Sequence, residues 1–316
     1  MLLLSGCGRE PYEKRSILCM DTYMTLQVRG KAETAQLCVQ ELRRLEGLWD
    51  PKLAGSEVFR LNSGETVRVD GLTLEALSAA AQVSEQTQGA LDLTVQTLWQ
   101  LWGFGTEQAR VPDEETLAQA LNKVDYRRIQ VQDGAVSLAE GSRLTFGSVA
   151  KGAAALHLRG LLEKAGVTSA LLDLGGSVCA VGGREDGSPW RIGVADPRTE
   201  GAMLGVLQVK DLAVITSSAS QRYFEQDGMR YHHILDPHTG FPAQSGLLSV
   251  TVVAENDLLA DALSTALFVV GEEKALQLYR QRGDFELILL TQDGRLTVTQ
   301  GLADCFQSSL PLIQAS

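Results

Sequence analysis

A carboxylate and a hydroxyl stand four residues apart near the C-terminal third of the chain. Asp261 and Thr265 belong to the apolar segment ADALSTALFVV (260–270), so they share one face of a predicted helix. Oxygen atoms of this kind suit a hard cation such as Mg²⁺, which usually keeps water and substrate phosphates as its other ligands. The alternative is an acidic first turn on an ordinary apolar helix. Burial of Asp261 and Thr265 would then be costly unless both found partners.

A second cluster places a lysine between glycines at the predicted start of a helix, in the segment GSVAKG (147–152). A helix N-terminus favours anions, small residues let a ligand approach the backbone, and Lys151 adds a positive charge. This pattern indicates phosphate binding, although its spacing differs from that of a P-loop. An ordinary helix start bounded by glycine would have the same pattern.

Three histidines lie between residues 232 and 238, beside an Asp-Pro pair. An imidazole in this position, such as that of His233, can act as a general acid or base near neutral pH. The Asp and Thr side chains of the segment would also hold a simple turn. Three imidazoles can bind zinc, but the oxygen pair at Asp261 and Thr265 makes zinc the less attractive ion.

The composition limits the function classes. The chain has 316 residues, 44% of them hydrophobic and 21% charged, which is enough for a sizeable core in one large domain or two smaller ones. The net charge of −11 argues against nucleic acid as the main partner. No apolar run reaches the roughly 20 residues that a membrane-spanning helix requires.

The N-terminus carries a distinct signal. The five cysteines include no CxxC pair, so a disulfide framework or a structural zinc site is not expected. The first residues, MLLLSGC, resemble a bacterial lipobox in which Cys7 becomes the lipidated N-terminus. The basic region of a signal peptide would then lie upstream of this sequence. We expect residues 1–16 to be a signal remnant and tether, and the protein to be lipid-anchored on the extracytoplasmic face of the cell membrane. The alternative is a chance leucine-rich N-terminus on a cytoplasmic protein.

The elements that position these clusters follow from periodicity and turn signals. Helices are predicted over 32–48, 72–87, 111–121, 149–165, 257–270 and 272–282. Strands are predicted over 17–28, 128–131, 135–138, 169–174, 190–194, 205–209, 213–216, 249–253, 285–290 and 296–299. The order has no regular βαβ rhythm and no long linker. We therefore expect an α+β fold, with an irregular α/β arrangement of mixed sheets flanked by helices.

Taken together, the clusters resemble the ApbE family, the FAD:protein FMN transferases. The segments that carry the resemblance follow one another in order from about Met20 to the C-terminus: GALDLTVQTLWQLWGFG, SVAKG, DLGGSV with PWRIGVADP, HILDPHTG and ADALSTALFVVG. The resemblance implies a single ApbE-like domain over residues 17–316. It also implies binding of FAD and Mg²⁺, and transfer of FMN from FAD to a Thr or Ser hydroxyl of a flavoprotein, with release of AMP.

The resemblance also assigns site residues. The catalytic set it implies is His233, Lys151 and Asp261. Mg²⁺ would be held by Asp261, Thr265 and the carbonyl of Ser148. FAD would contact Met20, Trp49, Ala90, Leu91, Asp92, Thr145, Lys151 and the main chain of Leu235. Trp49 stands where many members carry a Tyr, and its indole could serve as a stacking platform.

The chain departs from the family pattern at three places. Thr145 and Leu156 stand where many members have Asp, and TSSAS (216–220) replaces the usual Thr-Ser-Gly-Asp-Tyr. FAD affinity or acceptor choice would be affected, but the catalytic and metal positions are retained. The implied acceptor is a flavoprotein of a membrane redox system. Two other functions stay open: Mg²⁺-dependent hydrolysis of FAD to FMN and AMP, and FAD binding without turnover by a lipid-anchored protein.

Overall fold

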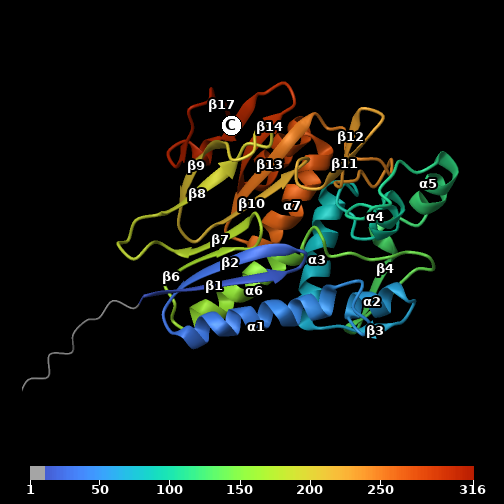
Figure 1. The fold of residues 1–316 in the computed structure, drawn as a ribbon, viewed down its shortest axis with the longest axis horizontal. Helices are drawn as coiled ribbons and strands as arrows, with labels where there is room; N and C mark the ends of the chain where they lie inside the picture. Colours follow the sequence, from blue (N-terminus) through green and yellow to red (C-terminus); the bar gives the residue numbers. More distant parts are fainter. Residues whose placement is uncertain (1–10) are drawn as a thin grey trace, which may run out of the picture.

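A nine-stranded mixed sheet forms the centre of the molecule (Figure 1). The structure is a computed structural model that describes residues 11–316. Neighbouring strands run antiparallel, except for the last pair, which is parallel. In spatial order the strands are β1 (Tyr12–Cys19), β2 (Thr22–Arg29), β6 (Ser169–Asp173), β7 (Ser177–Gly182), β10 (Ala213–Ser218), β13 (Leu247–Ala254), β14 (Phe285–Thr291), β15 (Leu296–Thr299) and β17 (Ile313–Ala315).

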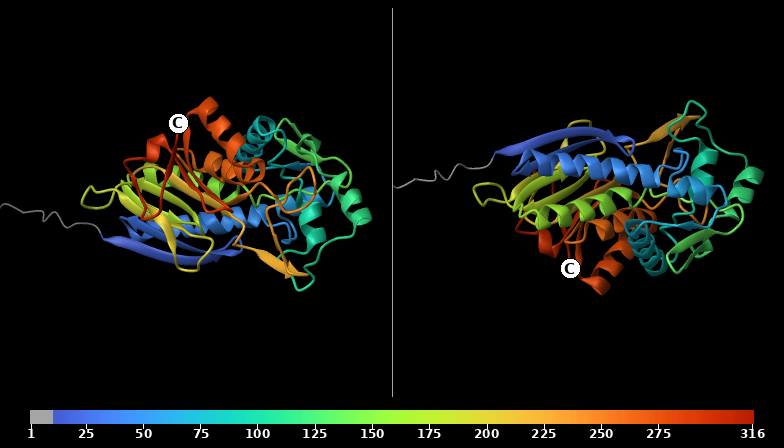
Figure 2. Two further views of the ribbon diagram at one scale, coloured as in Figure 1. Left: turned by 90° about the horizontal axis from the view of Figure 1, so that it is seen from above. Right: turned by 90° about the horizontal axis from the view of Figure 1, so that it is seen from below.

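Both faces of this sheet are covered (Figures 1 and 2). The helices α1 (Ala32–Trp49), α6 (Ala150–Lys164) and α7 (Asp257–Val270) pack on one face, with α3 (Gly71–Gln86) and α8 (Glu272–Arg282) against α7. The other face carries a small sheet of β8 (Trp190–Ala195), β9 (Met203–Val209) and β16 (Phe306–Gln307). Burial on both faces explains why β13 has almost no exposed side chain. The predicted α+β fold is confirmed.

The short elements gather at one end of the molecule (Figure 1). They are α2 (Glu57–Asn62), α4 (Gln96–Trp102), α5 (Glu114–Leu121), the 3-10 turn Tyr126–Arg128, the sheet of β3 (Val67–Arg68), β5 (Ala135–Leu138) and β4 (Ile129–Gln132), and the hairpin β11 (Tyr223–Gln226)–β12 (Met229–His232). A second 3-10 turn, Gln300–Leu302, lies near the C-terminus. Trp102 packs against Phe104, Phe224 and Tyr231, and its Nε1–H donates to the Gly240 carbonyl at 2.8 Å. This aromatic cluster joins α4 to the β11–β12 hairpin.

The N-terminal strand differs from its prediction. The predicted single strand over 17–28 is a hairpin, because Met20 and Asp21 turn the chain with φ of 50° and 57°. A two-residue hairpin loop requires this left-handed conformation, and it usually selects Asn and Gly, so Met-Asp gave no turn signal. β1 begins at Tyr12, so residues 12–16 of the expected tether belong to the sheet. Cys7 lies outside the described residues.

One helix also begins later than its prediction. The helix predicted over 111–121 begins only at Glu114, because the Asp113 side chain caps it by accepting from the Thr116 N–H at 2.9 Å. Within residues 11–316, every helix is too short or too polar to cross a membrane.

Candidate active site

One cleft of about 650 Å³ brings together every site residue that the sequence predicted. Its volume lies in the range of small-molecule and cofactor pockets. The walls come from the β1–β2 turn, the end of α1, the start of α6, the middle of α7 and the loops around residues 90, 220 and 235. The predicted residues on these walls are Met20, Trp49, Ala90, Leu91, Asp92, Thr145, Ser148, Lys151, His233, Leu235, Asp261 and Thr265. The roles assigned to them stay predictions.

Asp261 lies at the contact between α6 and α7. Its side chain is only 3% exposed, and its Oδ2 accepts the Gly152 N–H at 2.7 Å. Burial raises the pKa of the Asp261 carboxyl, while the nearby Lys151 ammonium opposes this shift. One turn further along α7, the Thr265 hydroxyl lies 3.3 Å from the Ser217 hydroxyl. The carboxylate and hydroxyl predicted to share a helix face do so, and they face the cleft.

The oxygen atoms available here fit a hard cation. In a regular helix the Gly152 N–H would donate to the carbonyl four residues back, but it donates to Asp261 instead. The Ser148 carbonyl is therefore left for another partner. Together with Asp261 and Thr265 it supplies a carboxylate, a hydroxyl and a carbonyl oxygen, which is a donor set for Mg²⁺. In the part of the chain that the structure describes, no three His, Cys, Asp or Glu side chains group as metal ligands, so the zinc alternative at residues 232–238 gains no support.

The close approach of α6 and α7 depends on a residue without a side chain. A Cβ on Gly152 would lie 2.5 Å from the Asp257 carbonyl oxygen and from the Asp261 Cβ. We expect Gly152→Ala to push the helices apart and to destabilise the fold by about 1–3 kcal/mol. Gly160→Ala is the matched control in the same helix, where a Cβ meets no atom within 4 Å. It should stabilise the fold by about 0.5–1 kcal/mol. Urea unfolding of both variants measures the difference, and equal stabilities would contradict the packing argument.

His233 is held in one tautomer by its own loop. Its Nδ1 lies 3.2 Å from the Arg222 carbonyl oxygen. A carbonyl only accepts, so Nδ1 carries the hydrogen and Nε2 keeps a lone pair that can take a proton. Neighbouring His232 instead packs its ring edge-on against Phe268, with Nε2 3.1 Å from the Ala243 carbonyl oxygen. Of the two residues, only His233 lines the cleft.

Burial lowers the pKa of His233 to about 4, and the positive charges of Arg222 and Lys151 act in the same direction. The imidazole is therefore neutral, and able to act as a base, at any pH well above 4. In an NMR titration of the ligand-free protein, we expect the His233 ring signals to stay in their neutral positions from pH 7 down to about pH 5. The His233→Gln spectrum assigns these signals, and circular dichroism at each pH checks that the fold is intact. A midpoint near 6.5 would contradict the burial argument.

Several predicted residues are held by local hydrogen bonds. The Asp92 carboxylate accepts the Thr94 N–H at 2.7 Å and the Thr94 hydroxyl at 2.6 Å, and burial raises the Asp92 pKa. The Thr145 N–H donates to the Leu93 carbonyl at 2.8 Å, and its hydroxyl accepts the Gly147 N–H at 3.2 Å. These bonds fix two of the loops that line the cleft.

The Trp49 side chain is less exposed to the cleft than a residue that stacks on a ligand would be. Its indole is 4% exposed and lies parallel to Phe146, with ring centroids 5.5 Å apart and an interplanar angle of 1°. One face of the indole is therefore already occupied. The area that Trp49 offers to a ligand in the cleft is small.

Some residues of the cleft belong to no motif that sequence analysis could find, among them Glu46, Phe146 and Arg222. The Glu46 carboxylate accepts the Met20 N–H at 2.6 Å, which fixes the β1–β2 turn against α1. Arg222 donates from Nη2 to the Asp21 carbonyl at 3.2 Å, and its own carbonyl holds His233. Both residues act on main-chain atoms, which no motif reveals.

The fold and this cleft define a class of protein. Residues 20–289 match the model of the ApbE family, and the chain belongs to that family. An FAD:protein FMN transferase of Treponema pallidum is 36% identical, with 95% of this chain and 90% of that protein covered. The protein of the same description from Escherichia coli is 31% identical, with 92% and 84% covered.

Solved structures agree. The ApbE protein of Thermotoga maritima superimposes with a TM-score of 0.86 at 31% identity, covering 94% of this chain and all of that one. The flavinyl transferase ApbE of Pseudomonas stutzeri, in its apo form, gives a TM-score of 0.84 at 30% identity, covering 98% of this chain and all of that one. The predicted family is confirmed.

Proposed function

We propose that this protein transfers FMN from FAD to a Ser or Thr hydroxyl of a flavoprotein and releases AMP. One observation carries the proposal: Lys151, His233, Asp261 and Thr265 line a single cleft with a volume suited to a large cofactor. The relatives reported above bear the name of this activity and cover nearly the whole chain. The family resemblance and the geometry therefore support the same reaction.

In this reaction the acceptor oxygen attacks the phosphorus of the FMN half of FAD. A phosphoester bond to the acceptor forms, the bond to the AMP oxygen breaks, and the electron pair leaves with AMP. The Nε2 of His233 takes the hydroxyl proton, since Nδ1 is already occupied with the Arg222 carbonyl. Lys151 lines the cleft, where its ammonium would meet the negative charge of the diphosphate.

The Ser148 carbonyl, Asp261 and Thr265 would hold Mg²⁺ in the same cleft. Bound there, the ion would neutralise charge that builds on the diphosphate oxygens. The contribution of this chain is to keep the three oxygen atoms in place before the substrate arrives. The hydrogen bond from Gly152 to Asp261 does this by tying α6 to α7.

A single assay tests the proposal. The protein is incubated with FAD, Mg²⁺ and membranes from cells in which its gene is deleted, since these contain the acceptor without its flavin. We expect AMP release and a fluorescent protein band after denaturing electrophoresis, with FMN located by mass spectrometry as a phosphoester on Ser or Thr. Free FMN with AMP and no labelled protein would instead indicate FAD hydrolysis. FAD retained without AMP would indicate a binding protein.

We further propose that Cys7 carries a lipid and holds the domain at the extracytoplasmic face of the membrane, where a membrane redox complex would supply the acceptor. The support is the Leu-Ser-Gly-Cys sequence alone. Fractionation of cells that produce the wild type or Cys7→Ser, followed by mass spectrometry of the N-terminal peptide, tests this. A wild-type protein without lipid, found in the soluble fraction, would contradict it.

A further inference from the structure

The short helix α2 contacts the turn that carries Ser148. At its C-terminal end, the Asn62 Nδ2 donates to the Leu144 carbonyl at 2.9 Å, and the Leu144 N–H donates to Asn62 Oδ1 at 2.6 Å. One side-chain amide therefore satisfies both backbone groups of a buried residue. These two hydrogen bonds hold the backbone of Leu144 in place, four residues before Ser148.

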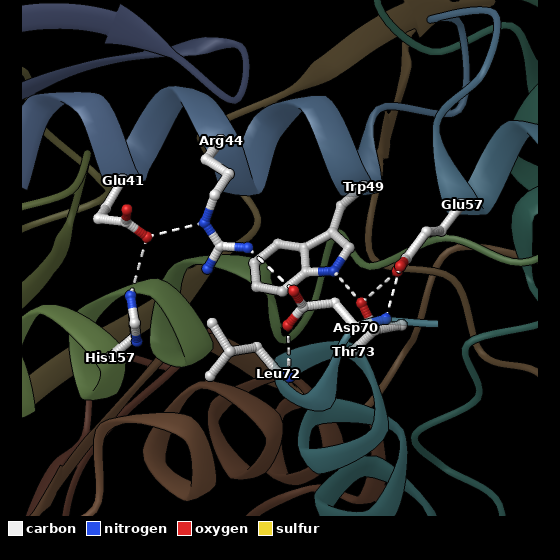
Figure 3. Close-up of polar contacts among 8 residues, drawn as sticks. All are labelled: Glu41, Arg44, Trp49, Glu57, Asp70, Leu72, Thr73 and His157. Atoms are coloured by element: carbon white, nitrogen blue, oxygen red, sulfur yellow. Dashed lines mark hydrogen bonds and ion pairs between the residues drawn. The ribbon is translucent and has the colours of Figure 1, made fainter. Parts of the chain in front are cut away.

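The N-terminal end of α2 begins a second chain of contacts (Figure 3). Glu57 accepts the Thr73 hydroxyl at Oε2 (2.5 Å) and the Asp70 N–H at Oε1 (2.6 Å). The fully buried Thr73 hydroxyl in turn accepts the Trp49 Nε1–H at 2.9 Å. Because an indole N–H only donates and a carboxylate only accepts, the direction of both bonds is fixed. The Trp49 ring is therefore locked in its plane.

The fixed Trp49 indole in turn restrains the turn that carries Ser148. Trp49 stacks on Phe146, whose carbonyl accepts the N–H groups of Val149 and Ala150 at 2.9 and 2.8 Å. These bonds form the first turn leading into α6. The two ends of α2 thus hold the segment from Leu144 to Ala150 at two separate points.

We propose that α2 is a positioning element for the ligand-binding turn, and that the positioning residues are Asn62 of α2 and Thr73 of α3, which α2 holds through Glu57. They hold the Ser148 carbonyl and the N-terminus of α6 where the diphosphate of FAD would lie, an assignment that rests on the proposed function. Asn62 and Thr73 do not line the cleft and act only through Leu144, Trp49 and Phe146. Such preorganisation removes the cost of ordering the turn when the ligand binds.

The first test is Asn62→Ala, with Arg60→Ala as the matched control. Arg60 lies on the same helix, and its guanidinium forms an exposed ion pair with Glu65. We expect Asn62→Ala to weaken FAD binding in calorimetry by about tenfold, with and without Mg²⁺, since both bonds to a buried backbone are lost. Hydrogen exchange should quicken at residues 144–151 and stay unchanged in β13. Arg60→Ala should match the wild type in both measurements.

The second test uses Thr73. Thr73→Val keeps the shape but leaves the Trp49 N–H without its acceptor, whereas Thr73→Ser keeps the hydroxyl. We expect Val to weaken FAD binding and to quicken exchange at 144–151, and Ser to restore both. A purely structural role would lower the melting temperature without this pattern.

The outcomes separate this inference from the proposed function. Wild-type protein that fails to label any acceptor overturns the proposed function, yet the exchange measurement, which needs no FAD, still tests α2. Wild-type exchange at residues 144–151 in both Asn62→Ala and Thr73→Val overturns the role of α2. Exchange that rises equally in β13 overturns it as well, because the effect would then be general destabilisation.

Discussion

Asp261→Asn should lose FMN transfer by roughly a hundredfold or more, which corresponds to about 3 kcal/mol of transition-state stabilisation. The substitution removes the negative charge and keeps the size of the side chain. An Asn oxygen still accepts the Gly152 N–H, so the contact between α6 and α7 survives. The fold should also tolerate the change, because Asp261 is almost completely buried and its charge is costly there. Steady-state AMP release over a range of Mg²⁺ concentrations measures the effect.

Thr97→Val serves as the control for Asp261→Asn. It removes a buried hydroxyl of α4 that has no hydrogen-bond partner in the described structure and does not line the cleft. It should leave transfer unchanged. If Asp261→Asn kept the wild-type rate at saturating Mg²⁺, the proposed metal site would be wrong, whatever the family of the chain.

The second large effect is expected for His233→Gln. If Nε2 removes the acceptor proton, losing it should lower kcat by about 10²–10⁴-fold, while the KM for FAD changes little. His238→Gln is the matched control, because His238 lies in the same segment, is exposed and does not line the cleft. Single-turnover transfer from FAD gives the chemical rate directly. Equal rates for the two variants would exclude His233 as the base.

Most of the fold could be predicted where periodicity was long. The helices over 257–270 and 272–282 have the predicted bounds, whereas α1 differs by one residue at its C-terminal end and α3 by one residue at each end. The prediction failed at short elements. The six residues of α2 are too few for a hydrophobic period, and the Met20-Asp21 turn uses residues that seldom adopt positive φ. Both are stabilised by contacts with distant parts of the chain, which a local pattern does not contain.

The residues of the candidate site also divide into those that the sequence could predict and those that it could not. Lys151, His233 and Asp261 stand in segments whose composition indicates chemistry, and the fold brings them to one cleft. Asn62 and Arg222 were missed because their side chains bond main-chain atoms of residues that are remote in sequence. Any residue can supply a backbone carbonyl, so such contacts leave no trace in residue type or spacing.

The direction of β1 has a consequence for how the enzyme would meet its partner. The strand runs eight residues from Tyr12 to Cys19, a length of about 23 Å, and Met20, which lines the cleft, follows directly after it. An anchor attached before Tyr12 would be connected to β1, an edge strand of the large sheet, at the end that lies farther from the cleft. Because Met20 lines the cleft at the other end of β1, a strand's length would separate such an anchor from the site at which a folded substrate has to bind.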